Sequence, residues 1–223
     1  MDSSPLSDTV LIQIGAVPIS RQVVTTWVIM IVLSVGCWLL TRRLASRVGG
    51  AHSIVEMAVM AFIDHISHIV GKDARPLLPL LGTLLVFLVV ANLSGILPGV
   101  KAPTAKLETP AALAVVVFVS VHYFGIRARG WLGYLASFAK PKPIMLPLNL
   151  ISEVTRTFSL TVRLFGNVMS GEFVIALIVA LAGLFVPIPF MALEILLGLV
   201  QAYIFTVLAT VFIGAAIDTA DRS

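Results

Sequence analysis

The sequence predicts an all-α integral membrane protein with about five membrane helices and one interfacial amphipathic helix, ending in a long, strongly tilted helical hairpin. The 223 residues are 59% hydrophobic and 12% charged, with a mean hydropathy of +1.06, which lies outside the range of water-soluble domains. Several apolar runs reach the roughly 20 residues that a spanning helix needs. These runs are continuously apolar rather than alternating, and this favours helices over a β-barrel.

The chain is expected to form a single membrane domain, 1–223, whose first segment is residues 1–50. The apolar core of a first span runs from Trp27 to Leu40 and stops at Arg42 and Arg43. Basic residues at the end of a span favour the cytoplasmic side of the membrane. The start of the chain lacks the basic residues and short apolar core of a signal peptide, so we expect the first span to be retained.

Residues 51–72 are predicted to form the interfacial amphipathic helix. At 100° per residue, polar side chains such as Glu56, Asp64 and His68 gather on one side, with apolar side chains largely opposite. Asp64, His65 and His68 also have the helical spacing of metal ligands. An exposed polar face explains them more simply, and we predict no metal.

Residues 76–127 are predicted to form a two-span hairpin. The second span runs from Leu77 to Leu97 and the third from Pro110 to Ile126, with a turn-rich loop between them. Arg127 and Arg129 follow the third span, so the basic loops after the first and third spans lie on the same side of the membrane. By the positive-inside rule, the amino terminus is then outside and the carboxyl terminus cytoplasmic.

Residues 146–218 are predicted to form the long tilted hairpin. No proline occurs between Leu148 and Val186, and a helix of that length would measure about 58 Å at 1.5 Å per residue. A second helix from about Phe190 to Asp218 would exceed ~40 Å. Both are longer than a hydrocarbon core of ~30 Å, so they must tilt strongly or kink. Gly166 and Gly171 can provide kinks or permit close helix approach.

The hairpin carries charged residues flanked by apolar ones: Glu153, Arg156, Arg163, Glu172 and Glu194. A charge at the bilayer centre costs from ~3 kcal/mol on insertion scales to more than ~10 in simulations. Arginine stays protonated, so Arg163 must face water or a partner. One alternative is a buried ion pair of Arg163 with Glu153 or Glu194 that only fixes packing. The other is a counter-charge on another subunit or a passing ion, because intramembrane charges commonly mark ion pathways.

The helical period places a polar stripe beside Arg163 on the first limb of the hairpin. Its other members lie within about 40° of Arg163 at 100° per residue: Arg156, Ser159 and Asn167. Glu172 lies about 180° around the helix, so it cannot pair with Arg163 within that helix.

The second limb carries its own polar stripe, because Glu194 and Gln201 are seven residues apart and nearly aligned. Packed antiparallel, the two limbs would form one polar track with Arg163 near its middle. Protonated Glu172 and Glu194 side chains that hydrogen-bond in a helix interface are the structural alternative. Asn92, in the second span, is expected to cap or hydrogen-bond a neighbouring helix.

The run Ser159–Asn167 (SLTVRLFGN) resembles the signature of subunit a of F-type ATP synthases, and Ser170–Glu172 continues it. Further segments agree with the family in the same order: Ala91–Gly99, Pro103–Leu107 and Leu199–Phe205. The resemblance extends from about residue 52 to the carboxyl terminus, whereas the first fifty residues fit only by hydropathy.

The resemblance implies an ion-translocating role for the hairpin. Arg163 resembles the stator arginine that faces the carboxylates of a rotating c-ring, and Asn167 and Gln201 resemble its polar neighbours. Glu172 and Glu194 fall where the family lines two half-channels. Residues with a supporting role would be Asn92, Ser159, Ser170, Glu153 and Arg156. The implied partners are the c-subunit ring, b-type peripheral stalk subunits, the rest of the complex and the lipid bilayer of a bacterial-type plasma membrane.

The sequence departs from the family at two places and so leaves the coupling ion open. Many members carry one histidine and one glutamate where this chain has Glu172 and Glu194, and Asn149 stands where others often have an acidic residue. Two carboxylates could serve protons, the commoner case, or bind Na⁺. The chain has no GxxxxGK[ST] phosphate-binding loop, so we expect a non-catalytic subunit without a cofactor, with nucleotide chemistry on its partners.

Two other functional classes are weighed against this interpretation. A self-contained helical ion transporter or channel would predict internal repeats around a midplane site, and the sequence has none. An intramembrane metal enzyme would need His65 and His68 deep in the bundle, whereas they fall on an amphipathic segment. The basic residues lie in short loops where they set topology, so nucleic acid is not an expected partner. The single cysteine, Cys37, allows no intramolecular disulfide.

Overall fold

The computed structural model describes residues 10–14, 17–45, 50–71, 74–95, 102–139, 145–183 and 186–218. Its elements are β1 (Val10–Ile14), β2 (Val17–Ser20), α1 (Arg21–Ala45), α2 (Gly50–Val70), η1 (Arg75–Leu77), α3 (Leu78–Ser94), η2 (Pro103–Ala105), α4 (Glu108–Ala139), α5 (Met145–Ala182) and α6 (Ile188–Asp218). The predicted all-α membrane class is confirmed. The antiparallel pair β1–β2 before the first apolar helix is an addition that hydropathy did not indicate.

Within the described residues, 4 helical stretches are long and apolar enough to cross a membrane: Arg75–Ser94, Glu108–Ala128, Leu146–Leu181 and Ile188–Ile217. A shorter apolar stretch, Val23–Leu39, lies in α1. Together they agree with the expectation of about five membrane helices. The expected end of the second span at Leu97, the Lys140 region and the first nine residues lie outside the described ranges.

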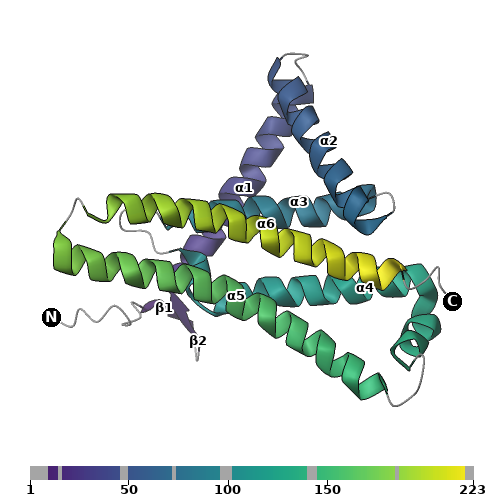
Figure 1. Ribbon diagram of the computed structural model, residues 1–223. Helices are drawn as coiled ribbons and strands as arrows, with labels where there is room; N and C mark the ends of the chain where they lie inside the picture. Colours follow the sequence, from purple (N-terminus) through teal and green to yellow (C-terminus); the bar gives the residue numbers. More distant parts are fainter. Residues whose placement is uncertain are drawn as a thin grey trace.

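Helices α1 and α2 project together from the side of the bundle (Figure 1). The far end of α2 returns to the bundle and contacts α6. This end is closed by Gly71, whose φ of 72° is the left-handed conformation that glycine adopts at helix ends. Its backbone N–H donates to the carbonyl oxygen of Ser67 at 2.8 Å, and the Ser67 hydroxyl oxygen accepts from the N–H of Ala74 at 3.2 Å. The helix Gly50–Val70 is therefore present where residues 51–72 were expected to form one, and its place at the membrane surface stays a prediction.

The core lies where α3, α4, α5 and α6 run beside one another (Figure 1). Apolar side chains of these helices meet there and are almost fully buried: Leu81, Leu88, Val117, Leu164 and Phe205. Burial on this inner side leaves much of the outer surface of α5 exposed and apolar, as expected for helices in lipid or against other subunits.

Helix α4 breaks at Gly130, whose φ of 74° and ψ of 164° are not helical. The helical segment after Gly130 carries Tyr134, which is buried against Gly125. A Cβ on Gly125 would lie 2.5 Å from the Tyr134 ring, so only glycine fits. Where we expected the helix to end at Ile126 and a loop to follow, a glycine in the left-handed region instead starts a second helical segment.

The terminal hairpin consists of two long helices, as predicted, and their tilt in the membrane stays a prediction. Helices α5 and α6 contain 38 and 31 residues, which correspond to about 57 Å and 46 Å. The two helices lie side by side near their connection and diverge toward the opposite end, where α4 lies close to both (Figure 1). Gly166 and Gly171 both lie inside the continuous helix α5.

Candidate functional site

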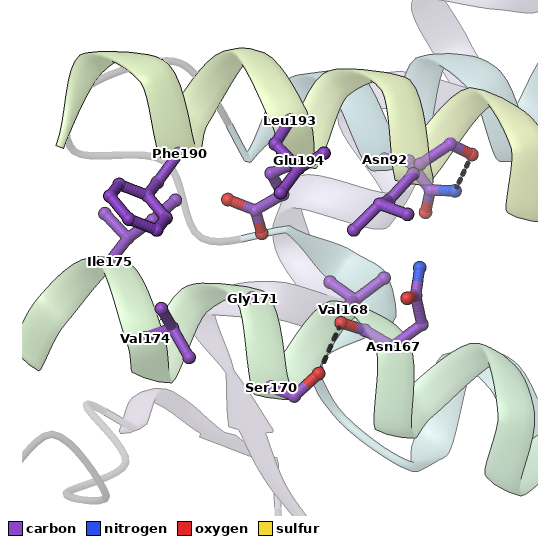
Figure 2. A pocket seen from close by; sticks show the side chains of 12 residues that line it. Asn92, Asn167, Val168, Ser170, Gly171, Val174, Ile175, Phe190, Leu193 and Glu194 are labelled. Carbon is purple, nitrogen blue, oxygen red and sulfur yellow. Dashed lines mark hydrogen bonds between the residues drawn. The ribbon is translucent and has the colours of Figure 1, made fainter.

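A cavity of about 280 Å³ lies between α5 and α6, and α3 closes one side of it (Figure 2). Glu194 projects from α6 into the space between the helices, and Asn167 points from α5 toward Asn92 (Figure 2). Apolar side chains such as Val174 and Phe190 line the rest of the wall. The polar groups from three helices therefore meet in a single, otherwise apolar space.

The close approach of α5 and α6 at this cavity depends on Gly171. A Cβ at Gly171 would lie 2.7 Å from Oε1 and 3.0 Å from the carboxyl carbon of Glu194. Because Gly171 has no side chain, there is room at this place for the Glu194 carboxyl group. Of the two expectations for this glycine, the structure shows close helix approach within an unbroken helix.

Glu172 faces a different environment from its neighbour Gly171. Its Oε1 accepts a hydrogen bond from the backbone N–H of Ala102 at 3.1 Å, and Ala102 lies at the start of η2. The carboxyl group therefore joins α5 to the segment that follows α3. This direction agrees with the helical period, which places Glu172 on the side of α5 opposite to Arg163.

Arg163 is exposed on α5, between the buried side chains of Leu160 and Leu164. Its guanidinium makes no hydrogen bond or ion pair with any residue in the described part of the chain. Glu153 is paired elsewhere, and Glu194 lies against Gly171. The buried ion pair that we considered as a structural alternative is therefore not present in these ranges.

Arg156 connects the two limbs of the hairpin away from the cavity. Its Nη1 lies 3.2 Å from Oε1 of Glu153, and its guanidinium carbon lies 4.5 Å from the centre of the Phe212 ring. Phe212 is eighteen residues beyond Glu194 in α6, about 27 Å along the helix. Arg156 and Glu153 thus lie at the far end of the hairpin, so the cavity does not bring them together with Glu194.

Gln201 is buried on α6, at 6% exposure. Its Nε2 has no hydrogen-bond partner among the described residues. A buried amide donor without a partner costs free energy, so the Nε2 group calls for an acceptor outside the described residues, such as an ordered water. Ser159 is exposed on α5, and the Ser170 hydroxyl donates to the backbone oxygen of Asn167 at 3.0 Å within the same helix.

Asn92 hydrogen-bonds a neighbouring helix, as its position in an apolar span led us to expect. Its Nδ2 donates to the backbone oxygen of Gly198 in α6 at 2.8 Å, the bond drawn in Figure 2. Its Oδ1 accepts from the Thr104 hydroxyl at 2.9 Å. Sequence analysis assigned no role to Thr104 or Gly198, because a single hydroxyl or glycine in an apolar stretch carries no periodic signal.

His65 and His68 do not gather with Asp64 into one three-residue cluster. His65 Nε2 lies 2.8 Å from the Tyr203 hydroxyl of α6, and His68 lies 3.6 Å from Asp64 with both side chains exposed. Across the described ranges, no three histidine, cysteine or acidic residues gather as a metal site would need. The His65–Tyr203 contact instead joins α2 to the hairpin.

Comparison with known proteins places this arrangement in a family. The family model described as ATP synthase A chain matches residues 23–214. The chain is 69% identical over 219 residues to ATP synthase subunit a 2 of Bradyrhizobium sp. (strain BTAi1), covering 98% of each protein. It is 45% identical to ATP synthase subunit a 1 of Hahella chejuensis, covering 98% of this chain and 93% of the relative. It is 41% identical to ATP synthase subunit a of Legionella pneumophila (strain Paris), covering 92% and 90%. With its long terminal hairpin and its exposed intramembrane arginine, the chain belongs to the ATP synthase A chain family, the subunit a of F-type ATP synthases.

Proposed function

We propose that this chain, as the stator subunit of an F-type ATP synthase, carries ions through two half-channels to and from the carboxylates of a rotating c-ring. Arg163 faces the ring, Glu172 and Glu194 line the half-channels, and Asn167 and Gln201 tune the surroundings of the arginine. The hairpin 146–218 is the ion-path unit, and residues 51–72 lie at the membrane surface.

The exposure of Arg163 is the observation that carries this proposal. A permanent cation in the middle of an apolar helix needs a counter-charge or water, since its burial in lipid is costly. Neither glutamate that we considered as its partner within the chain is available to it, because Glu153 pairs with Arg156 and Glu194 lies against Gly171. A carboxylate on a facing subunit supplies the counter-charge. The Arg163 side chain is then exposed when this chain is alone.

The two hairpin glutamates support separate water-accessible paths. Glu194 opens into the cavity between α5 and α6, together with the amides of Asn92 and Asn167. Glu172 turns away from that face to the η2 segment. The two carboxyl groups lie at neighbouring levels of the hairpin but on different sides of α5, and we assign each of them to its own half-channel.

The mechanism follows from the fixed charge. An ion that enters one half-channel neutralises a ring carboxylate, and this neutral site can then move through lipid during rotation. The positive charge of Arg163 keeps the facing carboxylate ionised and so prevents ions from crossing directly between the half-channels. Each elementary charge that crosses 100 mV releases ~2.3 kcal/mol, which biases the rotation.

The remaining assignments complete the proposal. The subunit is not itself catalytic, so ATP is made by other subunits of the complex, and b-type peripheral stalk subunits hold it against the ring. It resides in a bacterial-type plasma membrane with its amino terminus outside and its carboxyl terminus in the cytoplasm. This orientation rests on the basic residues Arg42, Arg43 and Arg127, which follow the first and third spans.

Replacement of Arg163 tests the proposal. In membrane vesicles containing the whole complex, Arg163→Ala should abolish ion-driven ATP synthesis while the complex still assembles. Arg163→Lys keeps a charge but loses the planar fork, so it should be severely impaired as well. Arg156→Ala serves as the control, because that arginine is paired with Glu153 away from the cavity. Normal synthesis by Arg163→Ala would contradict the assignment.

A further inference from the structure

The hydrogen bonds of Asn92 join three elements of the site. The Nδ2 group donates to the Gly198 oxygen of α6 at 2.8 Å, and Oδ1 accepts from the Thr104 hydroxyl of η2 at 2.9 Å. Because a backbone carbonyl oxygen can only accept, the amide has a single orientation that satisfies both contacts. Thr104 is fully buried, so its hydroxyl has no access to water as an alternative partner.

The contact with Gly198 is close and occurs at a sensitive place on α6. A Cβ at Gly198 would lie 3.1 Å from the Cβ of Asn92, so the glycine permits the approach of α3. Gly198 lies four residues after Glu194 and three before Gln201, on the same side of α6. A shift of α6 at this point would therefore move both polar residues of the second limb.

The same short segment also reaches the other limb of the hairpin. Ala102, immediately before η2, donates its N–H to Glu172 of α5 at 3.1 Å, while Thr104 within η2 orients Asn92. The chain of contacts thus runs from the carboxyl group of Glu172 to the carbonyl of Gly198, one helical turn from Glu194. Contacts within a single helix could not connect the two limbs in this way.

We propose that Asn92 and Thr104 are positioning residues of the ion path, which hold α6 in the register that places the Glu194 carboxyl in the cavity opposite Gly171. The proposal rests on the half-channel role of Glu194 given above. Asn92 acts through the Gly198 carbonyl, and Thr104 acts by orienting the Asn92 amide. The segment around η2 thereby becomes part of the ion-path structure, although it contains no titratable side chain that reaches the cavity.

The test compares two substitutions at Thr104 in the intact complex in membrane vesicles. Thr104→Val removes the hydroxyl and keeps the shape, whereas Thr104→Ser keeps the hydroxyl. Transport is followed as ATP-driven membrane potential with a potential-sensitive dye, which responds to H⁺ or Na⁺, and rates are divided by the amount of assembled complex. We expect Thr104→Val to lower the rate about three- to tenfold, the range set by interhelical hydrogen bonds in membranes. Thr104→Ser should restore it.

Thr206→Val is the matched control, because Thr206 is equally buried but its hydroxyl donates to Ala202 within its own helix at 2.9 Å. Since Asn92 and Thr104 act as one unit, Asn92→Ala and the double variant with Thr104→Val should be equally slow. Equal rates for the valine and serine variants at Thr104, or an equal loss in Thr206→Val, would overturn the positioning role.

Glu194→Gln, measured alongside, separates this inference from the proposed function. Loss of transport in Glu194→Gln together with a normal Thr104→Val rate removes only the positioning role. Normal transport by Glu194→Gln removes Glu194 from the ion path, and with it both the proposed half-channel and the inference that depends on it.

Discussion

At the scale of single residues, the polar groups of the hairpin divide into those that the chain satisfies itself and those that it leaves open. The Arg156 guanidinium pairs with the Glu153 carboxylate and lies over the Phe212 ring. The Glu172 carboxyl group accepts a hydrogen bond from the backbone N–H of Ala102. Arg163 is exposed and the buried Gln201 amide nitrogen lacks a partner within the described residues. The exposed Arg163 guanidinium is the group that a carboxylate of a facing subunit can pair with.

Water access at the two glutamates provides the prediction at this scale. With Cys37 replaced by serine, cysteines introduced at Glu172 and Glu194 should react with small water-soluble thiol reagents, because the reactive thiolate needs a polar, hydrated surrounding. Val119→Cys, at an exposed apolar position of α4, is the control and should react more slowly. Rates of labelling in vesicles with assembled complex are the measurement. Two inert cysteines at 172 and 194 would make these glutamates packing groups and place the ion path elsewhere.

At the scale of elements, the two long helices of the hairpin approach closely at one place and separate at another. Gly171 permits the close approach of α5 and α6, and Gly198 permits the close approach of α3 to α6. Toward the other end the limbs diverge, and α4 packs against both (Figure 1). The glycines therefore shape a polar space inside an apolar bundle, in keeping with the small residues that membrane helix contacts favour.

A side chain at Gly171 should disturb transport without breaking the helix. Gly171→Ala places a Cβ where the Glu194 carboxyl lies, 2.7 Å from its Oε1, so that carboxyl must move or the helices must separate. We expect ATP-driven transport to fall several-fold with the complex still assembled. Gly82→Ala is the control, because a Cβ there meets nothing within 4 Å, and alanine favours a helix by ~0.5–1 kcal/mol. A Gly171→Ala variant as active as Gly82→Ala would show that the Glu194 position is not critical.

At the scale of the whole molecule, the bundle of α3 to α6 presents an apolar outer surface while α1 and α2 project from its side (Figure 1). Exposed Phe158 of α5 is part of this surface, and α1 adds the exposed side chains of Trp27 and Trp38. The Arg42 guanidinium lies 4.2 Å over the Trp38 ring, near the end of α1, a pairing suited to the membrane–water interface. The molecule is thus built to lie in lipid and against other subunits.

The coupling ion is a property of the whole complex. Both residues that we propose to line the half-channels are carboxylates, which bind protons and can also contact Na⁺, so this subunit alone does not select between them. We expect ATP hydrolysis by the intact complex to be unchanged by added Na⁺ at fixed pH, since protons are the commoner coupling ion. The rate with and without Na⁺ is the measurement. Na⁺ stimulation that disappears when the ring carboxylate is blocked would identify a sodium-coupled complex.

Much of the fold followed from the sequence, because hydropathy and helical period are local properties. The apolar runs predicted the spanning helices, the absence of proline from Leu148 to Val186 predicted the long α5, and the spacing from Arg163 placed Glu172 on the opposite side of that helix. The break at Gly130 was missed, since a glycine in an apolar or amphipathic stretch does not reveal whether its φ is positive.

The partners of the polar side chains came only from the tertiary structure. Asn92 and Gly198 are 106 residues apart in the chain, and Ala102 and Glu172 are 70 apart, so no local pattern predicts that they meet. The same holds for Glu194 against Gly171, which depends on how two long helices cross. A helical period tells which residues share a side of one helix, whereas the choice of partner depends on the packing of all the helices together.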